Sequence, residues 1–204
     1  MAKVLFVLGN AGSGKTHFSR KFIKSELEQK NFWCLVDKDH VGEPITNQLM
    51  IKLGLDPDDR DSPIYKEEVR DLEYQAALSV IRDQLHLGIN VVAPGPWTKE
   101  LKNGVLFNNE NLGFPKETEL HYVYLDAKPL DVYNLIKKRN NKRDKWKLNH
   151  WEDFAKKLEK PQEIVYHNIL SLNYGLHFEK QKELVNHLGL KSEASWLGLS
   201  IKVI

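Results

Sequence analysis

The segment best suited to chemistry lies close to the N-terminus. It reads Gly9-Asn10-Ala11-Gly12-Ser13-Gly14-Lys15-Thr16 and fits the pattern G-x-x-x-x-G-K-[ST] at every fixed position. Glycines let successive backbone N–H groups turn inward toward an anion, and a helix that starts there adds partial positive charge. We expect the segment to cradle nucleotide phosphates, with Lys15 at the β- and γ-phosphates and the Thr16 hydroxyl on Mg²⁺.

The flanking residues supply the elements that this loop requires. Lys3 to Leu8 is a short apolar run typical of a strand buried on both faces. From Thr16 onward, apolar residues recur at three- and four-residue spacing, as on one face of a helix. Because a phosphate loop follows a strand and opens a helix, this context favours phosphate binding over a glycine-rich turn without a ligand.

Two carboxylates follow the second predicted strand, Phe32 to Val36. They are Asp37 and Asp39, separated by Lys38. In an open α/β sheet, ligands bind beyond the carboxyl ends of the strands, so both should lie beside the phosphate loop. One of them, Asp37, would hold Mg²⁺ or accept a proton from an attacking hydroxyl, and Asp39 would bind substrate. The alternative is that either residue caps the next helix.

The remaining pattern alternates helix and strand, which predicts an α/β class with a mostly parallel sheet. Further strands are expected at Asn90 to Ala93 and at Leu120 to Leu125, and a fifth near Ile169 to Leu172 or in the tail from Leu197. Residues 97 to 118 are expected to be irregular, with one or two helical turns. Expected helices cover Pro44 to Leu53, Pro63 to Leu87 with Ser62 as N-cap, Leu130 to Arg139, Trp151 to Leu158, Pro161 to Leu172 and Phe178 to Leu188.

Length and composition fit one globular domain over residues 1–204. The chain has 204 residues, 41% of them hydrophobic, and its net charge is +2. That charge is too small to argue for nucleic acid or an anionic membrane by itself. A single cysteine, Cys34, excludes an internal disulfide and a zinc site built from several cysteines. No apolar run is long enough to span a membrane or to act as a signal peptide, so we expect a cytoplasmic protein.

Three kinds of P-loop protein compete for this pattern. A GTPase is suggested by Asn141-Lys142-Arg143-Asp144, which fits N-K-x-D, but this tetrad follows a basic helix end instead of a buried strand. The third strand also ends in Val92-Ala93-Pro94-Gly95, without the aspartate of a D-x-x-G motif. A motor ATPase would need an acid at the end of an apolar strand and a longer chain. A small kinase remains, supported by the acidic pair after strand two.

The chain resembles a known family, the small P-loop kinases that include shikimate kinase, gluconate kinase, chloramphenicol phosphotransferase and the zeta-toxin-like kinases. The resemblance covers most of residues 3–160 and rests on the phosphate loop (a Walker A motif), Asp37-Lys38-Asp39, the strand Asn90 to Ala93 and the arginines described below. It implies a three-layer P-loop NTPase fold with a five-stranded, mostly parallel sheet and a helical lid. Residues 175–204 fall outside it as an unassigned extension.

The resemblance also implies roles for three arginines. Arg139 and Arg143 occupy the place of the lid arginines, which neutralise charge on the transferring phosphoryl group. The lid would span about residues 137–150, and its alternative is a solvated basic helix end. Arg70, on the long helix one turn before Tyr74, corresponds to a substrate-binding arginine, and its alternative is an ion pair with Glu73 or Glu67. Trp97 would wall the acceptor pocket or lie in the core.

The expected activity is therefore ATP- and Mg²⁺-dependent transfer of a γ-phosphate to a hydroxyl of a small molecule. Two alternatives stay open: a polynucleotide 5′-kinase, with nucleic acid bound by the basic stretch, and a nucleotide-binding regulatory NTPase. The acceptor pocket would be built by residues 40–70 and 94–118. The identity of the acceptor and the oligomeric state are left open.

Overall fold

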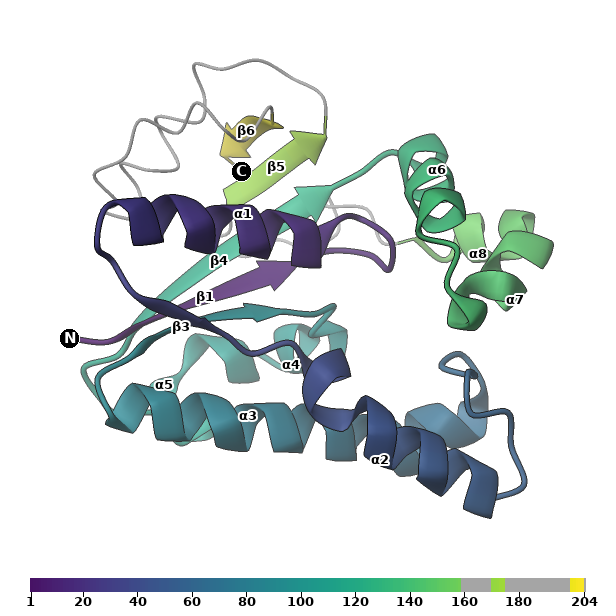
Figure 1. Ribbon diagram of the computed structural model, residues 1–204, viewed down its shortest axis with the longest axis horizontal. Coiled ribbons are helices and arrows are strands. Elements are labelled where there is room, and N and C mark those ends of the chain that lie inside the picture. The colour runs from purple at the N-terminus through teal and green to yellow at the C-terminus, as the bar shows by residue number, and fades with distance from the viewer. Residues whose placement is uncertain (159–169, 175–198, 204) are drawn as a thin grey trace.

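A central sheet organises the computed structural model, which describes residues 1–158, 170–174 and 199–203 (Figure 1). The strand order is β2-β3-β1-β4-β5-β6. The first five strands are parallel, and β6 runs antiparallel to β5. Their bounds are β1 Lys3–Leu8, β2 Trp33–Leu35, β3 Asn90–Pro94, β4 Glu119–Asp126, β5 Leu170–Tyr174 and β6 Leu199–Val203.

The predicted α/β class and mostly parallel sheet are confirmed, but the sheet has one strand more than the five expected. Both alternatives for the last strand are strands, β5 near Ile169 to Leu172 and β6 in the tail. The helix expected over Pro161 to Leu172 is wrong at its end, because Leu170–Tyr174 pairs with β4. The rest of that helix and the one expected over Phe178 to Leu188 lie outside the described residues.

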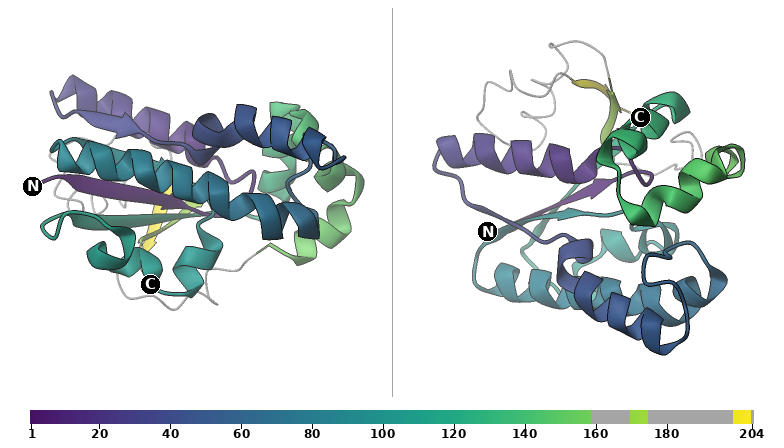
Figure 2. Two further views of the ribbon diagram at one scale, coloured as in Figure 1. Left: turned by 90° about the horizontal axis from the view of Figure 1, so that it is seen from below. Right: turned by 45° about the vertical axis from the view of Figure 1, so that its right-hand side comes forward.

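Helices cover both faces of the sheet, which gives the three layers expected. Figures 1 and 2 show α1 (Lys15–Glu28) on one face and α3 (Arg70–His86) on the other. All residues of β1 after Lys3 are buried, and β3 is buried after Asn90. The central strands are therefore covered on both sides, which explains their continuous apolar sequence.

The second helix begins earlier than its sequence pattern suggested. Helix α2 covers Lys38–Lys52, whereas Pro44 to Leu53 was expected. The reason is local: the Asp37 side chain caps the helix by accepting a hydrogen bond from the backbone N–H of Asp39, over 3.1 Å. This cap overrides Pro44, which lies inside the helix.

The long helix expected from Pro63 is present, with an irregular first part. The Ser62 hydroxyl accepts a hydrogen bond from the backbone N–H of Tyr65, as its N-cap role predicts. Tyr65–Val69 then forms a π-helical turn before α3 begins at Arg70. Such turns are rare and frequently occur at functional sites.

The helices that follow β4 lie beyond the carboxyl ends of the strands (Figure 1). They are α6 Pro129–Arg139, the 3₁₀ turn Lys142–Asp144, α7 Lys145–Asn149 and α8 Trp151–Lys156. The region expected to be irregular, residues 97–118, contains three short helical pieces: α4 Thr98–Lys102, the 3₁₀ turn Val105–Phe107 and α5 Asn109–Leu112.

Aromatic side chains fill the core under the third strand. Trp97 is fully buried, and its ring meets that of Phe6 edge to face with centroids 5.4 Å apart. Its indole N–H donates to the Ala93 carbonyl over 3.2 Å. Of the two roles considered for Trp97, the structure therefore supports the core role. In the part of the chain that the structure describes, no helix is both long and apolar enough to cross a membrane.

Candidate functional site

The phosphate loop connects β1 to α1 at the carboxyl edge of the sheet. Gly9, Gly12 and Gly14 have φ angles of 133°, 81° and 86°, which L side chains rarely adopt. The backbone N–H of Ser13 donates to the Asn10 carbonyl over 3.1 Å and closes the turn. The loop thus has the tight backbone path that its glycine spacing predicts.

Lys15 turns back over this loop. Its Nζ atom donates to the carbonyl oxygens of Gly9 (2.9 Å) and Asn10 (2.6 Å). Lys15 is half-buried, so part of its side chain is removed from water. This desolvation lowers the pKa of Lys15 to about 7; Asp39 and Asp37 oppose the shift, and Arg139 adds to it. A bound anion would reverse the shift.

Thr16 and Asp37 bring two oxygen donors together. The Thr16 hydroxyl donates to Oδ2 of Asp37 over 2.9 Å, and the Asp37 side chain is buried. Hydroxyl and carboxylate oxygens are ligands that Mg²⁺ prefers, and Mg²⁺ usually takes only one or two from protein, adding water and substrate phosphates. Among the described residues, no group of three or more His, Cys, Asp or Glu could hold a metal ion. The pair fits a metal held jointly with a nucleotide.

Asp39 has a different environment from Asp37. Its Oδ1 atom lies 2.7 Å from Nζ of Lys38, and its Oδ2 atom lies 2.8 Å from Nη2 of Arg143. Burial alone would raise the pKa of Asp39, but these two cations outweigh it and hold the pKa well below its usual range. Asp39 is therefore held as a carboxylate by two ion pairs, which makes it a poor proton acceptor.

Both lid arginines line the same cleft, and each meets a carboxylate. Nε of Arg139 donates to Oδ2 of Asp144 over 2.8 Å, whereas Arg143 reaches across to Asp39. Asn141 accepts a hydrogen bond from the backbone N–H of Arg143 and so caps the 3₁₀ turn. The N-K-x-D tetrad thus lies in the 3₁₀ turn that follows α6, not at the end of a strand.

The lid is also tied to the loop before the π-helical turn. Nζ of Lys147 lies 2.9 Å from Oδ2 of Asp61 and 3.7 Å from Oδ1 of Asp144. All three side chains are at least two-thirds buried. Salt bridges shielded from water are screened less than surface pairs, so this contact helps to hold α7 against the loop before the π-helical turn.

Arg70 lies in the cleft, but its partners are not those considered from the sequence. Nη1 and Nη2 donate to the two carboxylate oxygens of Glu100 over 3.0 and 2.9 Å, and Asp71 accepts from Nη1. The guanidinium also stacks on the Tyr74 ring, 3.9 Å from its centroid. Arg70 is thereby fixed in one orientation along the wall of the cleft.

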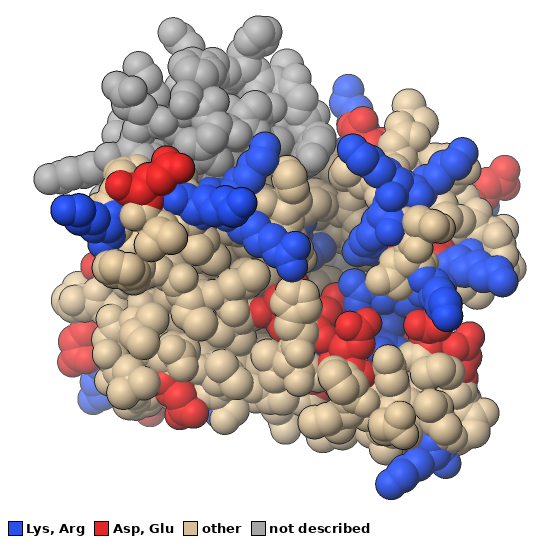
Figure 3. Space-filling model, viewed as in Figure 1, with Lys and Arg blue, Asp and Glu red and all other residues tan. Residues whose placement is uncertain are grey.

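Most of these side chains line one cleft with a volume of about 1010 Å³. The described residues that line it include eleven lysines and arginines and four aspartates, although the whole chain is almost neutral. Figure 3 shows these charges gathered around a hollow between the lid and the lower helices. The expected acceptor segments, residues 40–70 and 94–118, contribute in part: side chains within residues 60–70 and 94–103 line the cleft, but none of the described residues 40–59 or 104–118 does.

Several residues of the site were missed by sequence reasoning. The central one is Glu73, buried on α3, which accepts hydrogen bonds from Lys38, Tyr65 and Thr46. Arg60 and Lys147 were also missed. Glu73 lies in the first turn of α3, and its sequence context carries no signal of burial. Lys147 is one of seven basic residues in its stretch. The π-helical turn that points Tyr65 inward is likewise invisible to periodicity.

Comparison with known proteins identifies the fold. No protein-family model matches the chain, and no curated protein sequence matches it. Solved structures do. The APS kinase CysC of Mycobacterium tuberculosis, in complex with AMPPNP and APS, has a TM-score of 0.57 and 17% identity, with 92% of this chain and 98% of that chain covered. An unliganded sugar kinase from Janibacter sp. has a TM-score of 0.57 and 13% identity, covering 94% and 96%. The chain has the small P-loop kinase fold.

Proposed function

We propose that this chain is an ATP-dependent kinase that transfers a γ-phosphoryl group to a hydroxyl of a small molecule. The observation that carries the proposal is the shared cleft. The phosphate loop and the Thr16–Asp37 pair lie at one part of it, and side chains from residues 60–70 and 94–103 line the rest. The cleft thus extends beyond the phosphate loop, which leaves room for a second substrate beside the nucleotide.

Each part has a chemical task in this proposal. Loop N–H groups and Lys15 bind the phosphates, and Thr16 with Asp37 would hold Mg²⁺, which supplies charge neutralisation at the β- and γ-oxygens when bound. Arg139 and Arg143 supply further positive charge around the transferring group. Asp37 is the carboxylate better placed to accept the acceptor's proton, because Asp39 is committed to two cations.

The acceptor side supports a compact ligand bound against charged walls. Arg70, fixed by Glu100, and Lys38, next to Asp39, line this part of the cleft. We propose that Arg70 and Asp39 bind the acceptor. The polynucleotide reading needs exposed aromatic side chains along a basic stripe. Trp146 on the lid is exposed beside such a stretch, which keeps nucleic acid as the second candidate.

A turnover assay tests the proposal. Purified protein, Mg²⁺ and radiolabelled ATP are incubated with a panel of small hydroxyl compounds and, separately, with 5′-hydroxyl oligonucleotides. Transfer of label to a small compound, lost in Lys15→Ala, supports the kinase. Label on the oligonucleotides would favour the second candidate. ATP binding without any acceptor-stimulated turnover would favour a regulatory NTPase instead.

A further inference from the structure

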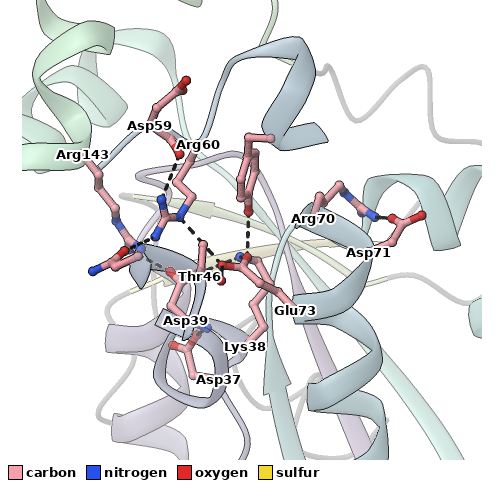
Figure 4. Close-up of polar contacts among 12 residues, drawn as sticks. Asp37, Lys38, Asp39, Thr46, Asp59, Arg60, Arg70, Asp71, Glu73 and Arg143 are labelled. Carbon is pink, nitrogen blue, oxygen red and sulfur yellow. Dashed lines mark hydrogen bonds and ion pairs between the residues drawn. The ribbon is translucent and has the colours of Figure 1, made fainter. Parts of the chain in front are cut away.

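Four charged side chains form a continuous line from α3 to the lid (Figure 4). Glu73 on α3 accepts from Nζ of Lys38 over 3.0 Å, and the same ammonium lies 2.7 Å from Asp39. The other oxygen of Asp39 lies 2.8 Å from Arg143 in the lid. Each charge in this line has the opposite sign to its neighbour. We call Glu73, Lys38, Asp39 and Arg143 the relay.

Glu73 is the fixed end of the relay. Its carboxylate is buried, and two hydroxyl groups hold it: Tyr65 donates to Oε2 over 2.7 Å and Thr46 to Oε1 over 2.7 Å. Nε of Arg60 adds a cation 3.8 Å from Oε1. Contacts from α2, the π-helical turn and the loop before it therefore hold this carboxylate from several sides.

Lys38 passes this constraint to Asp39. Its ammonium bridges Glu73 and Asp39 and faces the Tyr74 ring, 5.2 Å from the centroid. Without Glu73, the ammonium would have one carboxylate partner instead of two and could swing toward solvent in the cleft. Asp39 would then lose the contact that orients its second oxygen toward the lid.

We propose that Glu73 is a positioning residue, which acts through Lys38 and Asp39 to hold the lid arginine Arg143 at the phosphate-loop edge of the cleft. Glu73 itself touches neither lid nor phosphate. Its role in catalysis rests on the function proposed above, whereas its role in holding the lid does not. Residues of the acceptor side, Tyr65 and Arg60, are thereby coupled to the group that would neutralise the transferring phosphoryl.

Hydrogen exchange of the ligand-free protein, followed by mass spectrometry, tests the proposal without acceptor or turnover. We expect Glu73→Gln to speed exchange of peptides within residues 140–150 by about tenfold, with no change in β1 and β3. Asp39→Asn should do the same. The double variant should exchange no faster than Asp39→Asn alone, because both changes break one line of contacts.

A second buried glutamate provides the matched control. Glu26 on α1 is as buried as Glu73 and accepts from Trp33 and Asn31, far from the lid. Glu26→Gln should leave lid exchange unchanged. If Glu73→Gln fails to fold, Tyr65→Phe combined with Thr46→Val removes the two hydroxyl donors while the charge stays, and lid exchange should again rise.

Three results would overturn the proposal: lid exchange in the Glu73 variants equal to that of the unmodified protein, an equal rise in Glu26→Gln, or additive effects in the double variant. Once an acceptor is known, Glu73→Gln should lower kcat about tenfold with little change in the KM for ATP. Absence of any kinase activity would count against the proposed function alone, since the exchange result stands without it.

Discussion

Oδ2 of Asp37 lies 2.9 Å from the Thr16 hydroxyl, so the start of the first helix and the end of the second strand share one contact. The other oxygen of Asp37 caps α2 through the Asp39 N–H. One carboxylate thus links the phosphate loop to α2. Both alternatives considered for Asp37, helix cap and site residue, are compatible, because they use different oxygens.

Asp37→Asn separates these two tasks. Asparagine caps helices as well as aspartate does, so we expect the fold to survive. Loss of the negative charge should weaken Mg²⁺ binding and lower Mg²⁺-dependent turnover by about 100-fold, while nucleotide binding without Mg²⁺ persists. Turnover and binding are measured against Asp153→Asn, which changes an exposed carboxylate in α8. Unchanged turnover would exclude Asp37 as metal ligand and as base.

The lowered pKa of Lys15 predicts that the protein takes up a proton when it binds nucleotide. This pKa of about 7 means that at pH 8 only about a tenth of the free protein carries the proton. Phosphate oxygens nearby favour the charged form and raise the pKa, so binding at pH 8 should take up nearly one proton. Affinity should accordingly weaken as the pH rises from 7 toward 9.

Calorimetric titration with nucleotide at pH 8, in buffers of different ionisation enthalpy, measures this uptake directly. Lys15→Met removes the titrating group and should remove the buffer dependence, even where binding is weaker. The number of protons taken up is the slope of the binding enthalpy against the buffer ionisation enthalpy. If this slope is the same in both proteins, Lys15 is already charged before the nucleotide binds.

The sequence predicted those parts of the molecule whose physics is local. The glycines of the loop, the apolar run of β1 and the Ser62 cap each act through neighbours in the chain, so their elements follow from spacing alone. The relay does not. Glu73 and Lys38 are 35 residues apart, and only the packing of α3 against α2 brings them together. For the same reason, sequence spacing offers Arg70 only partners from its own helix, Glu67 and Glu73, whereas its partner in the structure, Glu100, lies on α4.

Trp97 tests the assignment of a core residue next to the cleft. Trp97→Ala removes a fully buried indole that packs on Phe6 and Tyr74, and we expect a loss of about 3–5 kcal/mol in the free energy of unfolding. Residue 97 keeps the φ angle of 48° in the unmodified protein and in Trp97→Ala, so the difference in free energy of unfolding reports lost packing. Urea denaturation measures it. Trp146→Ala, at an exposed lid position, should cost less than about 1 kcal/mol. Equal losses would contradict the core role.

Gly12 connects the phosphate loop to the base of the lid. An added Cβ would lie 2.5 Å from Cγ1 of Ile136 and 3.2 Å from Cγ1 of Val132, both on α6. Gly12→Ala therefore has two costs, the overlap with α6 and the φ angle of 81°, which is worth about 1–2 kcal/mol for an L residue. We expect nucleotide affinity to fall by more than about tenfold.

A second substitution separates the two costs of Gly12→Ala. Ile136→Ala removes the nearest overlapping atoms but leaves the backbone demand, so the double variant should recover part of the affinity and no more. Nucleotide dissociation constants for the four proteins of this cycle give the coupling between the two positions. If the loop rests on α6, the double variant should lose less nucleotide-binding free energy than the two single variants lose together. Strict additivity would mean that the loop moves independently of the lid helix.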